Sequence, residues 1–458
     1  TTNVVEEMTV TVNSLLSKEG VQYLFKSAVS NFTGFAPLGT VLVALLGVGL
    51  AEGTGFISAL LKKLVMSTPK RLITVVVVLA GVLSSIASDA GYVVLIPLGA
   101  IIFLSVGRHP MAGLAAAFAG VSGGFSANVM VGPTDSLLGG LTTEGAKLFD
   151  PNYVVGMEAN WWFLIASTVL ITVIGTFVTE KIVEPRLGAY KGDATVEENS
   201  MTVTKEEKRG LKFAGIAALV ILVGIIALVG PANGLLRGTD PGVQGILKSP
   251  FMDSLVFIIA LYFGLVGIAY GVGAKTVKND KDVMNLMGKS MASMGSYIVL
   301  VFFAAQFVAY FSYTNLGTII AVKGADMLQA IGLQGIPLVI LFILVVAFIN
   351  IFMGSASAKW AILAPVFVPM LMKVGFTPEF TQMAYRIGDS TTNLISPLMS
   401  YFALIVTFAH KYDKDSGIGT LISTMVPYSI SLLIGWTLLL IIWFVFNLPL
   451  GPGISIFM

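Results

Sequence analysis

The 458-residue sequence has few charged residues, little histidine and no cysteine, and each shortage excludes a class of protein. Charged side chains make up only 11% of it, whereas a soluble domain needs about a quarter to cover its surface. Without cysteine there can be no disulfide, thiolate chemistry or cysteine-ligated metal. Both histidines, His109 and His410, lie near predicted loops, so we expect no histidine-based metal centre. Water therefore cannot surround the chain on all sides.

What the sequence does contain is long apolar runs, with 56% hydrophobic residues and a mean hydropathy of +0.89. A hydrocarbon core about 30 Å thick needs roughly 20 apolar residues for each helical crossing. Because backbone groups must be satisfied internally within lipid, we predict membrane-spanning helices for these runs. They fall near 36–61, 160–180, 211–231, 251–271, 293–313 and 418–447.

Four other apolar stretches are interrupted by polar residues. Residues 72–105 and 335–373 each have a polar tip, at 84–89 and 354–359. The arms on either side of each tip have about 15 residues, or roughly 23 Å of helix, which is short for a crossing. We therefore predict two re-entrant hairpins. Two further spans, 111–139 and 380–410, are predicted to be broken by glycine, proline and polar residues.

Basic residues are concentrated in every second predicted loop. Of the 27 lysines and arginines, 18 fall in one set of alternating loops and six in the other. Since cytoplasmic loops collect positive charge, the basic set is predicted to be cytoplasmic. Both chain termini then lie outside, the first hairpin enters from the cytoplasm and the second from outside. No signal-peptide pattern opens the chain.

The two halves share an order of features, which predicts an internal repeat. Asp89, Pro97, Asn128 and Pro133 correspond to Ser357, Pro365, Asn393 and Pro397, at displacements of 264 to 268 residues. An odd number of crossings between the halves would make the repeats inverted, with a binding site near the midplane at half-helix ends. The predicted organisation is an external segment (1–35, with one interfacial helix near 21–30), a first repeat (36–185), a cytoplasmic linker (186–212), connecting helices (213–290) and a second repeat (291–458).

Ionisable residues inside the predicted spans are candidates for an ion or substrate path, because burying them in hydrocarbon is costly. They are Glu52, Asp89, Asp135, Lys359, Arg386 and Asp389. Arg386 and Asp389 are three residues apart and can pair on one helix face. They form either a structural salt bridge or a site in which Asp389 binds a cation or relays protons and Arg386 attracts an anionic substrate.

The neighbours of Asp389 favour the functional interpretation. Residues 389–393 supply five oxygen-bearing side chains, the ligand type that hard cations prefer. Pro397 lacks an N–H group and so frees a carbonyl one turn earlier. Polar residues 126–135 are the counterpart in the first half, although they could merely repair a broken helix. Trp360 is either a packing residue or an aromatic platform for a planar ligand.

Absent motifs narrow the function further. Gly288-Lys289-Ser290 would end a phosphate-binding loop only if residue 283 were glycine, but it is valine. The chain therefore encodes no nucleotide-driven pump, and no nucleophile–base pair typical of an intramembrane hydrolase is visible. We expect a transporter and not an enzyme.

The sequence resembles the AbgT family, bacterial transporters named for p-aminobenzoyl-glutamate uptake. The resemblance covers essentially the whole chain. Family members usually have one more hydrophobic helix before the external segment, so we expect one span fewer here. The matching strings are Asn-Phe-Thr-Gly-Phe-Ala-Pro-Leu-Gly (31–39), Ser-Gly-Gly-Phe-Ser-Ala-Asn (122–128) with Gly-Pro-Thr-Asp (132–135), Ser-Ala-Ser-Ala-Lys-Trp (355–360) and Arg-Ile-Gly-Asp-Ser-Thr-Thr-Asn (386–393).

The resemblance implies a fold and a set of functional residues. The fold is an all-α membrane protein, a bowl-shaped homodimer in the bacterial inner membrane, with the inverted repeats, re-entrant hairpins and broken helices of the divalent anion:sodium symporters. Substrate residues would be Asp135, Ser357, Trp360, Arg386 and Pro397, with Asp389 also in the transport site. A sodium ion would lie near Asn128, Asp389 and Asn393. No other cofactor, and no nucleic acid, is expected.

The implied function is ion-coupled carriage of p-aminobenzoate-type folate precursors: import of p-aminobenzoyl-glutamate, or export of sulfonamide antimetabolites. A dicarboxylate symporter of related architecture and a channel lined by paired hairpins are the alternatives. Trp360 argues against the dicarboxylate symporter. The sequence leaves the transport direction and the choice between sodium and protons open.

Overall fold

The computed structural model describes residues 11–87, 91–192, 203–240, 244–247, 249–330 and 332–458. Every regular element within these ranges is helical, apart from isolated backbone bridges near the C-terminus. Eight of the described helices are long and apolar enough to cross a membrane, or nine if one sharply bent pair counts as a single span. The prediction of an all-helical, multi-pass membrane protein is therefore confirmed.

Each of the six predicted long spans contains a long apolar helix. The helix of the predicted span 36–61 ends eight residues early, at Gly53. The helix of the predicted span 211–231 begins six residues earlier, at Lys205, where Thr204 and Glu207 form a capping box. The helices are α2 (Ala36–Gly53), α8 (Trp161–Val178), α10 (Lys205–Val229), α13 (Leu255–Ala274), α15 (Gly295–Tyr313) and α21 (Ile418–Val445).

Both predicted broken spans are interrupted. In the first, α6 (Pro110–Phe118) and the π-helical turn η4 (Ala119–Gly123) are followed by nine non-helical residues, 124–132, before α7 (Pro133–Ala146) begins. In the second, eight residues, 394–401, separate α19 (Pro378–Asn393) from α20 (Phe402–His410). Unpaired backbone groups at such ends need partners from elsewhere, and these interruptions position the site described below.

The first predicted hairpin has short arms, α4 (Ile73–Leu83) and α5 (Ile96–Ser105), extended by the short turns η2 (Ser84–Ala87) and η3 (Gly91–Leu95). The arms of the second hairpin are longer: α17 (Gly335–Phe352) has 18 residues and α18 (Ala356–Val374) has 19. At 1.5 Å per residue each is roughly 27 Å long or more, so the predicted 15-residue arms were wrong. The predicted tip, 354–359, is largely helical because α18 begins at Ala356, capped by Ser355. Re-entrance of both hairpins stays a prediction.

Two helices lie where loops were expected, and a predicted helix near the N-terminus is longer than expected. In the basic segment 273–290 begins α14 (Asp280–Ser293), capped by Asn279, and the predicted loop 313–334 contains α16 (Leu316–Ala330). The helix predicted near 21–30 is α1 (Lys18–Thr33). Short elements complete the described chain: α3 (Phe56–Met66), η1 (Lys70–Leu72), η5 (Thr179–Val183), α9 (Glu184–Leu187), α11 (Gln244–Leu247) and α12 (Pro250–Asp253).

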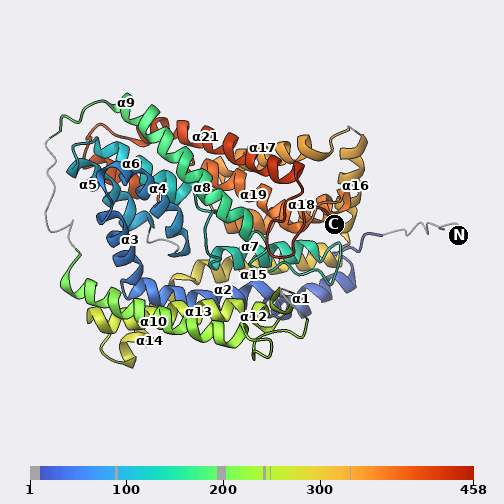
Figure 1. Ribbon diagram of the computed structural model, residues 1–458. Coiled ribbons are helices and arrows are strands. Elements are labelled where there is room, and N and C mark those ends of the chain that lie inside the picture. The colour runs from blue at the N-terminus through green and yellow to red at the C-terminus, as the bar shows by residue number, and fades with distance from the viewer. Residues whose placement is uncertain (1–10, 88–90, 193–202, 241–243, 248, 331) are drawn as a thin grey trace.

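The helices form two groups, one along each side of the molecule, and interrupted segments lie between the groups. In Figure 1, α2, α10 and α13 lie along one side of the molecule, and α8, α17, α19 and α21 along the other, with α7 between. The C-terminal segment folds back on the loop after α18, where Thr377 N–H donates to the Ile456 carbonyl at 2.9 Å. The C-terminus therefore lies beside α18, as Figure 1 also shows.

Close packing of α2 against α13 depends on small residues. A Cβ atom on Gly47 would lie 1.8 Å from the Ala260 carbonyl oxygen, and one on Gly267 would lie 2.7 Å from the Ala51 Cα. Small residues of this kind let helix backbones approach each other in membranes. The contact holds α13 against α2.

We predict that Gly47→Ala destabilises the protein by about 1–3 kcal/mol, because the new methyl group meets backbone atoms that cannot rotate away. The readout is the thermal unfolding midpoint of detergent-purified protein. Gly39→Ala is the matched control on the same helix, since nothing lies within 4 Å of its added Cβ. Equal midpoints for the two variants would contradict this packing account.

Candidate functional site

A cavity of about 290 Å³ lies where the interrupted segments of the two halves meet. Its volume is near the lower end of the range of roughly 300–1,000 Å³ typical of small-molecule sites. Its wall is mostly apolar and aromatic with a few polar groups. The lining residues are Val41, Leu45, Tyr92, Phe125, Pro133, Thr134, Leu137, Met294, Tyr297, Gly354, Ala356, Ser357, Asn393, Met399, Ser400 and Tyr401.

Two helix N-termini open onto this cavity. Pro133 and Thr134 are the first residues of α7, and Ala356 and Ser357 are the first residues of α18. The first N–H groups of a helix lack intrahelical partners and carry partial positive charge. Such ends bind carboxylates and other anions. The cavity thus presents two anion-attracting backbone ends beside aromatic rings, including Tyr92 and Tyr401, which stack with centroids 4.6 Å apart.

A buried ion pair joins the two halves next to these ends. Arg386 Nη1 on α19 lies 2.7 Å from Asp135 Oδ1 at the start of α7, and the two side chains are 3% and 5% exposed. The other Asp135 oxygen accepts the Gly132 N–H at 2.7 Å, which closes the first turn of α7. Asp135 therefore both caps a broken helix and neutralises the arginine of the opposite half.

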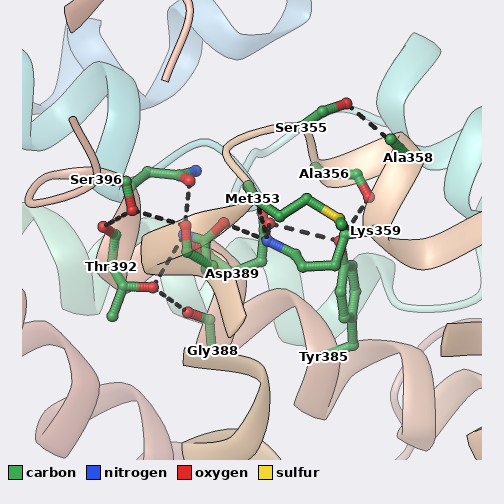
Figure 2. A network of polar contacts seen from close by, with 12 residues as sticks. Met353, Ser355, Ala356, Ala358, Lys359, Tyr385, Gly388, Asp389, Thr392 and Ser396 are labelled. Atoms are coloured by element: carbon green, nitrogen blue, oxygen red, sulfur yellow. Dashed lines mark hydrogen bonds and ion pairs between the residues drawn. The ribbon is translucent and has the colours of Figure 1, made fainter. Parts of the chain in front are cut away.

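A second buried ion pair lies between α18 and α19, within the network drawn in Figure 2. Lys359 Nζ is 2.6 Å from Asp389 Oδ1, and each side chain is 1% exposed. Lys359 also donates to the Asn350 side-chain oxygen and, at 3.3 Å, to the Met353 carbonyl. The Asn350 amide donates to the Asp389 carbonyl at 2.7 Å. Asn350 on α17 therefore connects all three helices.

These two pairs replace the pairing that spacing suggested. Arg386 and Asp389 do not pair with each other; each forms an ion pair with a residue on another helix. Residues three apart are rotated by about 60° around a helix, so neighbouring helices can separate them. The salt bridge within α19, one of the two interpretations, is therefore not formed: the two charges connect α19 to α7 and to α18.

Trp360 lies outside the cavity wall. Its side chain is fully buried, its indole N–H donates to Thr142 Oγ1 at 2.9 Å, and its ring stacks on Tyr385 with centroids 4.3 Å apart. Gln382 also donates to Thr142 Oγ1, at 2.8 Å. In this conformation Trp360 packs α18 against α7 and α19.

The other predicted residues divide between the cavity and the helix breaks. Ser357 and Asn393 line the cavity. Asn128 lies in the break before α7, where its amide donates to Ser85 at 2.7 Å and its oxygen accepts the N–H groups of Val129 and Met130. Pro397 is exposed in the break after α19.

Two predicted intramembrane charges lie apart from this arrangement. Asp89 falls outside the described residues. Glu52 is half-buried near the end of α2. Of the described residues predicted as substrate or ion ligands, Ser357 and Asn393 reach the cavity wall, and Thr134 of the predicted polar stretch 126–135 reaches it too.

Several polar residues with central positions were not predicted. Asn350 is completely buried, and its amide also donates to Thr392 Oγ1 and Asn393 Oδ1, both at 2.9 Å. It lies inside an apolar run, where an isolated amide is the available signal of a hydrogen-bonding role. Thr142 and Gln382 carry no comparable signal, since nothing in the sequence shows that α7 packs against α19.

Comparison with known proteins identifies close relatives. A family model described as the AbgT putative transporter family matches residues 1–458. The chain is 42% identical over 445 residues to the p-aminobenzoyl-glutamate transport protein of Escherichia coli strain K12, covering 97% of this chain and 87% of that protein.

Two solved structures are also similar. The Alcanivorax borkumensis YdaH transporter, described as having an unusual topology, has a TM-score of 0.93 and 48% identity, with 99% of this chain and 94% of that chain covered. Neisseria gonorrhoeae MtrF, described with a class of antimetabolite efflux pumps, has a TM-score of 0.90 and 53% identity, with 97% and 88% covered.

We predict that Asp135→Asn and Arg386→Gln each lower stability by about 3–5 kcal/mol, because each leaves a buried charge without its partner. The double variant should lose much less than the sum of the two. A double-mutant cycle on thermal midpoints in detergent measures this coupling. Glu144→Gln and Lys147→Gln are the control, since that pair is more exposed and should contribute only about 0–1 kcal/mol. Additive losses at Asp135 and Arg386 would show that the pair carries no coupling.

Proposed function

Because this chain belongs to the AbgT family of transporters, we propose that it carries p-aminobenzoate-type compounds across the bacterial inner membrane by ion-coupled secondary transport. The chain is a multi-pass membrane protein, and its relatives are named a transport protein and efflux pumps, not enzymes. Its cargo would be p-aminobenzoyl-glutamate in the import direction, or sulfonamide antimetabolites in the export direction. None of the three relatives' names favours a dicarboxylate symporter or a channel.

The observation that carries the proposal is the chemistry of the cavity wall. p-Aminobenzoate derivatives combine a flat aromatic ring with at least one carboxylate. The N-termini of α7 and α18 suit the carboxylate, and the rings of Tyr92, Tyr297 and Tyr401 suit the aromatic part. A sulfonamide antimetabolite shares the aminophenyl ring, and its sulfonyl oxygens can accept from the same N–H groups.

The proposed mechanism follows from the broken helices. We infer that the two halves are inverted repeats. Movement of one repeat against the other would open the cavity first to one side of the membrane and then to the other, as in other carriers with interrupted helices. The ion pair between Arg386 and Asp135 joins α19 to α7 across the two halves, so a change in its partners would couple their movement. A sodium or proton gradient would supply the driving force.

The proposed assembly is a homodimer, with the basic loops on the cytoplasmic side as positive charge requires. The first hairpin would enter the membrane from the cytoplasm and the second from outside. These features rest on the sequence pattern and on family membership.

The direct test is flux in proteoliposomes under imposed sodium or pH gradients. We expect gradient-dependent movement of radiolabelled p-aminobenzoate or p-aminobenzoyl-glutamate, and lower sulfonamide accumulation in expressing cells if export is the physiological direction. No gradient-dependent flux of either compound, together with unchanged sulfonamide accumulation, would reject the substrate class.

We predict that Ser357→Phe lowers this flux at least tenfold, since the added ring enters the cavity at the start of α18. Thermal stability should change little by comparison, because Ser357 is only half-buried. Ser67→Phe, an exposed residue in the loop after α3, is the matched control and should retain flux. Full flux in Ser357→Phe would place the substrate elsewhere.

A further inference from the structure

Lys359 is in an unusual position for a lysine. It lies in the first turns of α18, where the positive end of the helix disfavours a cation. It is also 1% exposed, and a charge is costly to bury unless it is paired and hydrogen-bonded. The structure must therefore contain groups that compensate strongly for this ammonium.

Those groups form a set of oxygen ligands. They are a carboxylate oxygen of Asp389, the amide oxygen of Asn350 and the backbone carbonyl of Met353. The carbonyl is available because α17 ends at Phe352, directly before it. Carboxylate, amide and carbonyl oxygens from a helix break are the ligands that a small hard cation takes. The site has the chemistry of a cation site, and Figure 2 shows the lysine nitrogen inside it.

One side-chain oxygen of each predicted sodium ligand is already engaged, and only Asp389 has a second side-chain oxygen, Oδ2, which is without a hydrogen-bond partner in the described part of the chain. Asp389 Oδ1 contacts Lys359, and Asn393 Oδ1 accepts from the Asn350 amide at 2.9 Å. Asn128 uses its oxygen for the backbone of its own loop and contacts Ser85, not the α19 network. These oxygens do not form one open cage, so the residues present do not fit a sodium ion at Asp389 while Lys359 stays in place.

The local charge balance leads to the same result. Among the described residues of this region, the Lys359–Asp389 and Arg386–Asp135 pairs balance, with two positive and two negative charges, all 5% exposed or less. One Asp389 oxygen, Oδ2, has no hydrogen-bond partner. A sodium ion bound there in addition would leave one uncompensated positive charge in the interior, which burial opposes.

We propose that Lys359 is a tethered cation: its ammonium occupies the oxygen site at Asp389 in place of a sodium ion. This proposal rests on the proposed transport function, because an ion-coupled carrier needs a site for its coupling cation. It implies that Asp389 does not bind the coupling sodium ion in the conformation described. Removing the lysine nitrogen should therefore create a sodium site where none is open.

The test is ion binding to purified full-length chain, which does not require the substrate to be known. Wild-type protein should have the same thermal midpoint in sodium chloride and in choline chloride. Lys359→Ala should show a saturable rise in the midpoint with sodium, together with ²²Na⁺ binding. Lys359→Ala/Asp389→Asn should lose both effects. Lys373→Ala, an exposed lysine at the other end of α18, is the matched control and should behave as wild type.

Two outcomes would overturn the proposal. One is sodium binding by the wild type that Asp389→Asn removes. The other is a folded Lys359→Ala variant with no response to sodium. If Lys359→Ala does not fold, Lys359→Met replaces it, and the comparison of wild type with Asp389→Asn stands on its own. Failure of p-aminobenzoate transport would not alter these readouts, so it is distinguishable from failure of this proposal.

Discussion

The constraint on which this structure depends is the cost of burying charge. Four of the buried ionisable side chains on α7, α18 and α19 form two ion pairs, each between two different helices; a fifth, Glu379, accepts a hydrogen bond from Tyr153. Removing one partner from a buried pair is typically more damaging than replacing both. The helices that carry these charges are therefore held in one register, and that register sets the shape of the cavity beside them.

The helix interruptions place helix ends in the interior, beside the buried charges. A continuous helix satisfies its own backbone, whereas α7 and α18 begin inside the molecule at the cavity wall, and the side chains of Asp135 and Ser355 close their first turns. Side chains satisfy the other broken ends: Asn128 accepts from its own loop, and Ser396 donates to the Asn350 and Thr392 carbonyls. The protein thus closes its broken ends with its own side chains, and the partial positive charge of two helix starts faces the cavity.

Much of this was predictable from sequence, because apolar length, polar interruption and loop charge are local properties. The six long spans and both broken spans followed from such patterns. Pairing between helices did not, since sequence spacing shows which residues share a helix but not which helix lies opposite. A salt bridge between Arg386 and Asp389 was accordingly one of two interpretations left open, and Asn350 was missed as a single amide in an apolar run. Helices α14 and α16 were taken as loops because α14 has few apolar residues and α16 ends in a weakly apolar segment.

The central claim is that the cavity at the starts of α7 and α18 holds the aromatic carboxylate. Since the 458-residue chain has no cysteine, a cysteine placed at position 357 by Ser357→Cys is its only thiol. The decisive measurement is the rate at which a water-soluble thiol reagent modifies it, with and without p-aminobenzoyl-glutamate. The account predicts slower modification with the compound and no change for Ser67→Cys. Equal rates at position 357 across a saturating range of the compound would contradict it.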